Sequence, residues 1–157
     1  MKLKDFDFRI WDGKKYINNI KGGVYIHKIN DHIKCLNRSQ DCYDYEFELD
    51  DLDNSNLEIE LFTGLYDKNG NKIYENDILM NELTEEIFYI TRDDTYKMSE
   101  IILYGKDYNG NLYRKRNPGG INLLKMFVSD KNMSVVGNIH ENPELLEEGK
   151  QWKLANL

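Results

Sequence analysis

The sequence has little of several features that common protein classes require. Alanine occurs once, at Ala155, and proline occurs twice in 157 residues. Few alanines beside many Tyr, Ile, Val and Phe residues favour strands over helices, because β-branched and aromatic side chains suit a pleated sheet. No apolar run approaches the ~20 residues that a membrane-spanning helix needs, and residues 1–5 hold no apolar signal core. These absences predict a β-rich, soluble, cytoplasmic protein.

Positive charge is also scarce. The chain has 21 Lys and Arg residues against 28 Asp and Glu residues, a formal net charge of −7. Non-specific binding of nucleic acid needs a basic face that displaces counterions, so the overall charge argues against it and leaves only a local basic patch open. Aromatic residues, at 12%, suffice for a packed core.

The motifs of common active sites are missing from the sequence. It contains no Gly-x-Ser-x-Gly, phosphate-binding loop or dinucleotide fingerprint. His27, His32, Cys35 and Cys42 do not have the spacing of a standard zinc finger, and free thiols are the ordinary state in a reducing cytoplasm. The acidic segment 50–56 lacks the glycine and the bidentate glutamate of a calcium loop. We therefore predict no catalytic residues, no metal ligands and no cofactor.

The stretch 62–78 organises the rest of the chain. Asn69-Gly70 is a strong turn signal because both residue types tolerate positive φ. Strand-type residues follow at 72–75, and Asn76-Asp77 marks a second turn before another apolar run. The same turn chemistry returns at Asn109-Gly110, so we expect positive φ at both glycines.

Three segments in order carry a family resemblance. FTGLYDKNGNKIYENDI at 62–78, FRIWD at 8–12 and VGNIHENPEL at 136–145 together resemble the YopX family of phage and prophage proteins. The chain departs from the family pattern at Ile10, where a small residue is usual, at Asn76, where glycine is usual, and at His140, where tyrosine is usual. The resemblance implies a small β-rich phage protein of unknown activity in a bacterial host cell. It carries over no catalytic residues.

The chain predicts mainly β structure in a small antiparallel barrel, SH3-like or related, with N-terminal β-hairpin extensions. Asn142-Pro143-Glu144 predicts the start of a short C-terminal helix, with asparagine as the cap and proline at the first helical position. We expect residues 1–61 to form a β-rich segment that packs on the barrel. Residues 62–157 would form the barrel core, the helix and the tail. Further strands are expected at 8–17, 24–29, 87–90, 101–104 and 133–139, and residues 30–42 are expected to be a loop or a short helix.

An acidic hairpin is predicted between residues 43–49 and 57–61. Alternation would turn Leu57, Ile59 and Leu61 inward and place Glu58 and Glu60 in solvent. No Lys or Arg lies between positions 38 and 68. The acidic face is either a solvated surface that protects a sheet edge or a docking face for a basic partner.

Two further places are candidates for partner binding. Arg114, Lys115 and Arg116 form the only basic cluster, and Tyr104, Tyr108 and Tyr113 lie nearby, a combination found in single-strand binding. Three cations in an acidic chain also suit a solvated strand end. Trp11 is either a core residue or an interface anchor.

The leading hypothesis from sequence is a non-enzymatic accessory protein that acts as a binding or assembly module. A protein partner or self-association as a homo-oligomer is favoured over nucleic acid. The first alternative is a nucleic-acid-associated factor that uses residues 104–116. The second is a small hydrolase with a carboxylate or metal site.

Overall fold

The computed structural model describes residues 1–17, 24–38, 49–51, 56–93, 98–114 and 131–147. Antiparallel strands dominate these ranges, which confirms the mainly β prediction. Contacts divide the chain into two compact units. The main unit comprises Met1–Phe6 and Leu61–Leu157, and the N-terminal unit comprises Asp7–Glu60. None of the helical segments in the described ranges has the length and apolar character needed to span a membrane.

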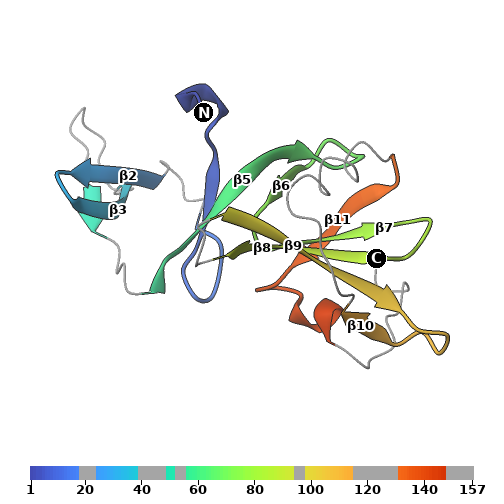
Figure 1. The fold of residues 1–157 in the computed structure, drawn as a ribbon. Helices are drawn as coiled ribbons and strands as arrows, with labels where there is room; N and C mark the ends of the chain where they lie inside the picture. The colour runs from blue at the N-terminus through green and yellow to red at the C-terminus, as the bar shows by residue number, and fades with distance from the viewer. Residues whose placement is uncertain (18–23, 39–48, 52–55, 94–97, 115–130, 148–157) are drawn as a thin grey trace. The chain divides into compact units, whose positions relative to one another are not determined.

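The main unit is built on a five-stranded sheet with the order β10-β9-β8-β7-β11 (Figure 1). Its strands are β7 (Asp77–Asn81), β8 (Ile87–Asp93), β9 (Met98–Lys106), β10 (Leu112–Arg114) and β11 (Met133–Asn138). Strands β7 to β10 follow one another as neighbours, and β11 returns to pair with β7. Among the described strands the sheets stay open, with β10 and β11 at the two edges, so the SH3-like barrel is not confirmed.

The sheet of the main unit is covered on both faces. Successive side chains of a strand point to opposite faces, and all of β7 is buried. Leu79 joins one apolar cluster with Phe88 and Ile101, whereas its neighbour Ile78 joins a second cluster with Tyr104. This two-sided burial explains why β7 reads as an almost continuous apolar run in the sequence.

The C-terminal end of the described chain packs on the second cluster. A 3-10 helix, η3 (Pro143–Leu146), stands where the short helix was predicted, with proline at its start, and a longer helix is not confirmed. Leu145 and Leu146 contact the cluster of Ile78. The side chain of Asn142 does not cap the turn, because its Oδ1 accepts a hydrogen bond from Asn138 N at 3.3 Å.

The turn between β5 (Glu58–Tyr66) and β6 (Lys72–Tyr74) has the predicted geometry. Gly70 has a φ of 81° and Gly110, in the matching turn between β9 and β10, has a φ of 82°, which confirms both predictions. Gly64 also has positive φ, at 86°, where the β5–β6 register shifts. Thr63 Oγ1 donates to Ile73 O at 2.8 Å beside this irregularity.

The N-terminal unit contains the sheet β2-β3-β4 and strand β1 (Phe8–Trp11), which neighbours β5. In the turn after β1, Asp12 Oδ1 accepts hydrogen bonds from Lys14 N and Lys15 N, and Trp11 bridges to Tyr16. Strand β2 (Val24–Ile29) also agrees with the sequence. The loop or short helix expected at 30–42 is wrong over its first part, because β3 (His32–Arg38) pairs with β2 through a tight turn in which Asn30 has a φ of 52°.

The predicted acidic hairpin is wrong in its described part. Strand β4 (Leu49–Asp51) pairs with β3, and residues 58–66 belong to another sheet. The inward and outward positions are also reversed in part. Glu60 is 1% exposed because Arg9 and Tyr16 bind its carboxylate, whereas Ile59 is 44% exposed. Residues 43–48 lie outside the described residues.

The close approach of Gly137 to the loop after β11 gives a first testable prediction. A Cβ at Gly137 would lie 2.5 Å from Asn142 Oδ1 and 2.9 Å from Asn142 Cβ, so the loop would have to move. We expect Gly137→Ala to lower the free energy of unfolding by about 1–3 kcal/mol, the usual range for overpacking. Denaturant unfolding followed by circular dichroism measures it. Adding Asn142→Gly removes the clashing atoms and should recover most of the loss, and a double variant as unstable as the single one would contradict this explanation.

Candidate interaction surface

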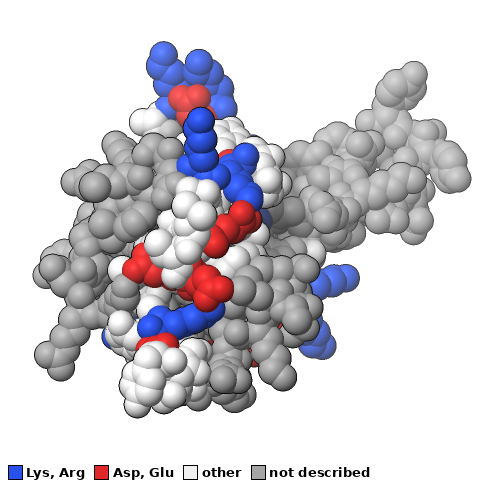
Figure 2. Space-filling model, turned by 90° about the vertical axis from the view of Figure 1, so that its right-hand side faces the viewer, with Lys and Arg blue, Asp and Glu red and all other residues white. Residues whose placement is uncertain are grey.

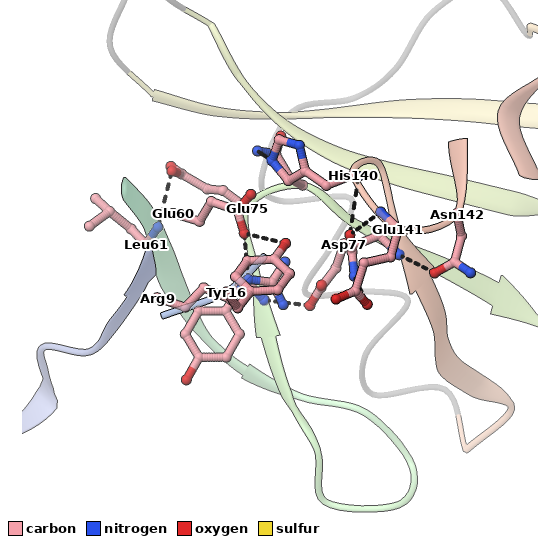
Figure 3. A network of polar contacts seen from close by, with 12 residues as sticks. Arg9, Tyr16, Glu60, Leu61, Glu75, Asp77, His140, Glu141 and Asn142 are labelled. Carbon is pink, nitrogen blue, oxygen red and sulfur yellow. Dashed lines mark hydrogen bonds and ion pairs between the residues drawn. The ribbon is translucent and has the colours of Figure 1, made fainter. Parts of the chain in front are cut away.

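Glu60 is the first of several buried carboxylates that could suggest chemistry. In the N-terminal unit its Oε2 forms an ion pair with Arg9 Nε and accepts a hydrogen bond from Tyr16 OH at 3.1 Å (Figure 3). The guanidinium of Arg9 also lies 4.7 Å from the centre of the Tyr16 ring. The ion pair, the hydrogen bond from Tyr16 and the contact of Arg9 with the Tyr16 ring therefore stabilise one another. The Arg9–Glu60 pair connects β1 to the start of β5.

Two more buried carboxylates, Glu75 and Asp77, lie in the turn between β6 and β7 of the main unit (Figure 3). Glu75 Oε1 accepts from Arg92 Nη1 at 3.0 Å, and its Oε2 accepts from Leu61 N at 3.2 Å. Asp77 Oδ2 accepts from Tyr74 N at 2.8 Å and so closes the turn. Both side chains hold backbone segments together.

The side chains of Asn76 and His140, two departures from the family pattern, lie together. Asn76 Nδ2 is 3.5 Å from His140 Nε2, and Asn76 Oδ1 accepts a hydrogen bond from Tyr89 OH at 3.1 Å. Asn76 has a φ of 69°, the left-handed conformation that its turn requires. The segments 62–78 and 136–145 therefore meet at the end of the sheet, where Ile139 N also donates to Asn76 O at 2.9 Å.

Asp67 organises the β5–β6 turn and attaches it to β11. Its Oδ1 accepts from Asn69 N at 2.8 Å and Asn71 N at 2.9 Å, and its Oδ2 accepts from Val135 N at 3.1 Å. Burial raises the pKa of Asp67, but the hydrogen bonds from Val135 and Asn71 outweigh it and hold the pKa below its ordinary value of 3.8. Asp107 has the same local bonds in an exposed turn without the bond to β11.

These carboxylates have structural partners, and the described residues contain no group of three or more His, Cys, Asp or Glu side chains that could hold a metal ion. The histidines and the cysteine of β2 and β3 do not converge on one site. His27 and His32 are exposed, whereas Cys35 is buried with a free thiol whose pKa is raised by burial. On β3, His32 and Cys35 are three positions apart and so lie on opposite faces. Cys42 lies outside the described residues.

The hollowed surface of the N-terminal unit is lined almost entirely by aliphatic side chains. This aliphatic groove has a volume of about 140 Å³ and is lined by Ile10, Ile26, Ile33, Lys34, Cys35, Leu57 and Ile59. Ile10 and Cys35 are buried beneath it. Around them Ile26 is 39% exposed, Ile33 60% and Ile59 44%. Clustered exposed isoleucines are unusual, since large apolar patches on soluble proteins mark interaction sites.

Strand register explains how the aliphatic groove forms. Ile26 pairs with Cys35 and Lys28 pairs with Ile33 in the β2–β3 hairpin, so these four side chains share one face. This surface was not predicted from the sequence, because residues 30–42 were expected to form a loop or a short helix. The signal was present: Asn30-Asp31 separates two segments in which apolar residues recur at every second position.

Of the predicted basic site at the end of β10, the structure describes Arg114 and the three tyrosines. Tyr108 is 97% exposed and Tyr113 45% exposed, whereas Tyr104 is 8% exposed and packs in the core. Tyr113 and Arg114 are consecutive on β10 and point to opposite faces. Lys115 and Arg116 lie outside the described residues.

Charges near this end of the main unit are mixed in sign. Lys106 Nζ is 2.7 Å from Glu85 Oε2, and Lys68 forms an ion pair with Glu82. Figure 2 shows the side where the β7–β8 and β9–β10 turns lie in Figure 1, and basic and acidic side chains are interleaved over its described part. A surface of this kind does not provide the single-sign field that attracts a nucleic-acid backbone.

Trp11 lies on β1 and is half-buried. Its ring meets the Tyr16 ring edge-on, with 5.0 Å between centroids and an interplanar angle of 66°. Such a contact contributes to packing. A role of Trp11 as an interface anchor stays a prediction.

Comparison with known proteins agrees with the resemblance seen in the sequence. The family model described as YopX protein matches residues 7–147, and the chain belongs to the YopX family. The crystal structure of protein EF1440 from Enterococcus faecalis is similar in fold, with a TM-score of 0.50 and 24% sequence identity, over 90% of this chain and 98% of that chain. No curated protein matches the sequence.

Proposed function

We propose that this YopX-family protein is a phage- or prophage-encoded accessory factor that binds another macromolecule and catalyses no reaction. Membership of the family supports the phage origin. The aliphatic groove is the observation that carries the binding role, because three isoleucines are kept between 39% and 60% exposed around a buried apolar floor. We place the protein in the bacterial cytoplasm, where self-association is one form that this binding can take.

The contacts of the buried carboxylates support the non-enzymatic part of the proposal. A catalytic acid or base needs an approach for substrate. Glu60 and Glu75 are instead buried in ion pairs with Arg9 and Arg92, and backbone N–H groups donate to both carboxylate oxygens of Asp67. Carboxylates bound in this way stabilise the fold.

A pull-down from the bacterial host tests this function. Wild-type protein and Ile33→Ser would be used as bait, with and without nuclease, and captured proteins identified by mass spectrometry. We expect a protein partner that survives nuclease and is lost with Ile33→Ser. Leu83→Ser is the matched control, because Leu83 is 76% exposed in the other unit. Equal capture by wild type and Ile33→Ser would contradict a binding role for the aliphatic groove.

A nucleic-acid-associated role is the second candidate, favoured by the exposure of Tyr108, Tyr113 and Arg114. Reversing the charges of Arg114, Lys115 and Arg116 together should abolish retention on single-stranded DNA and RNA columns if this role is real. Unchanged retention would contradict it.

A further inference from the structure

We infer that the aliphatic groove binds an extended, acidic segment of a partner protein, which inserts an aliphatic side chain and places a carboxylate two residues along against Lys28. This inference rests on the proposed binding function and names the chemistry of the partner. Size, charge and strand geometry each support it.

The size of the aliphatic groove suits protein side chains. Its volume is about 140 Å³, whereas pockets for whole small molecules occupy roughly 300–1,000 Å³. Its lining is aliphatic apart from Lys34 and the buried thiol of Cys35. An aliphatic side chain presented by a polypeptide therefore matches both the volume and the lining.

The charge beside strand β2 favours an acidic partner. Strands β2 and β3 with their turn contain Lys28, Lys34 and Arg38 against Asp31, whereas the acids Asp50 and Asp51 lie on β4, at the edge of the described sheet opposite β2. Lys28 is exposed, pairs in register with Ile33 and forms no ion pair in the described part of the chain. By strand alternation His27 and His32 point to the other face of the hairpin, and Lys34 starts from that face although it contributes to the lining of the aliphatic groove. Lys28 is the cation on the face that Ile26 and Ile33 share.

Strand geometry sets the spacing that the partner needs. Strand β2 is at the edge of the described sheet β2-β3-β4, so an added strand can pair with it and form backbone hydrogen bonds. A residue opposite Ile26 would then face the aliphatic groove, and a residue opposite Lys28 would form a cross-strand charge pair. These positions are two residues apart, about 7 Å along a strand. The expected motif is an aliphatic residue, any residue, then Asp or Glu, in either chain direction.

Peptide display tests this inference on the full-length chain. A random-peptide library would be selected against the protein, and the selected peptides synthesised for fluorescence-anisotropy titration. We expect the selected peptides to be enriched in aliphatic-x-acidic motifs. Lys28→Glu should lower their affinity on the order of tenfold, because it removes one charge pair. Ile33→Ser should weaken binding at least as much. Lys14→Glu, a charge reversal at an exposed turn of the same unit, and Leu83→Ser are the matched controls and should leave affinity unchanged.

A charge swap gives the sharpest result. Peptides in which the acid is replaced by lysine should bind Lys28→Glu better than they bind wild type. Selected peptides that lack an acid, or that bind Lys28→Glu as tightly as wild type, would overturn the inference. So would Ile33-dependent binding to vesicles of anionic phospholipid, or Ile33-dependent self-association in light scattering, with no peptide motif selected. In those cases a host partner lost with Ile33→Ser would still support the proposed function, so the two failures can be told apart.

Discussion

Replacing Arg9 with methionine is expected to lower the free energy of unfolding of the N-terminal unit by about 3–5 kcal/mol, because it strands a buried carboxylate without its counter-charge. Glu60 is 1% exposed, and the Tyr16 hydroxyl also donates to its carboxylate at 3.1 Å. Trp11 reports on this unit, since its ring lies 5.0 Å from Tyr16. Denaturant titration followed by Trp11 fluorescence, in a Trp152→Phe background, measures the loss.

A double variant separates loss of the pair from loss of packing. Arg9→Met with Glu60→Leu replaces both charges by apolar side chains and should recover most of the stability, because apolar replacements of buried ion pairs are often neutral. Tyr16→Phe removes one hydrogen bond and should cost about 1 kcal/mol. An Arg9→Met variant as stable as wild type would contradict the buried ion pair.

Replacing Asp67 with asparagine is expected to cost about 2–4 kcal/mol, because an amide keeps one acceptor where the carboxylate had two and loses charge-assisted bonds. Asn69 N, Asn71 N and Val135 N all donate to this carboxylate. The lost bonds hold the β5–β6 turn together and against β11. Thermal unfolding of wild type and variant, followed by circular dichroism, measures the effect.

Asp107→Asn is the matched control, since Asp107 makes the same local bonds from Asn109 N and Asn111 N. Asp107 lies in an exposed turn and has no hydrogen bond to a distant strand among the described residues, so its replacement should lower the melting temperature far less than Asp67→Asn does. Equal losses from the two variants would mean that the bond to Val135 contributes nothing.

The pH dependence of stability should differ between wild type and Asp67→Asn. The pKa of Asp67 in the folded protein is below 3.8, so its ionised form stabilises the fold at pH values above the unfolded pKa. That contribution is lost as the pH falls from about 4 through the lower folded pKa. Wild type should therefore lose stability more steeply than Asp67→Asn in this acid range. Parallel curves would show that Asp67 is not the group responsible.

Local turn chemistry was the part of the fold that the sequence predicted best. Asp-x-Asn-Gly-Asn determines its own conformation through bonds within five residues, and Gly70 and Gly110 adopt the expected φ. The strands that enter and leave these turns could be predicted from the turns. The prediction of burial failed where it depends on a residue distant in the sequence. Glu60 occupies a solvent-facing position in the alternating pattern, but Arg9, 51 positions away, binds its carboxylate and stabilises its burial.

The candidate site was harder to predict than the fold for a related reason. Arg114 and Tyr104 are cross-strand partners, but Tyr104 on the inner strand β9 packs in the core whereas Arg114 on the edge strand β10 is exposed. The aliphatic groove collects Ile10, Ile26, Ile33 and Ile59 from four strands, and no short segment contains it. It becomes visible only after the β2–β3 pairing is known.

The two Asn-Gly turns also have a chemical consequence for how the protein ages. Asparagine followed by glycine is the dipeptide most prone to deamidation, because the glycine nitrogen can attack the asparagine side chain and form a succinimide. In the folded protein Gly70 N donates to Asp67 O at 3.1 Å and Gly110 N donates to Asp107 O at 2.9 Å, so both nucleophiles are engaged. The tight turn restrains the cyclisation that an unfolded chain permits. Isoaspartate at Asn69 or Asn109 would therefore accumulate in molecules whose turns have opened, and its amount would record how long the chain had spent unfolded.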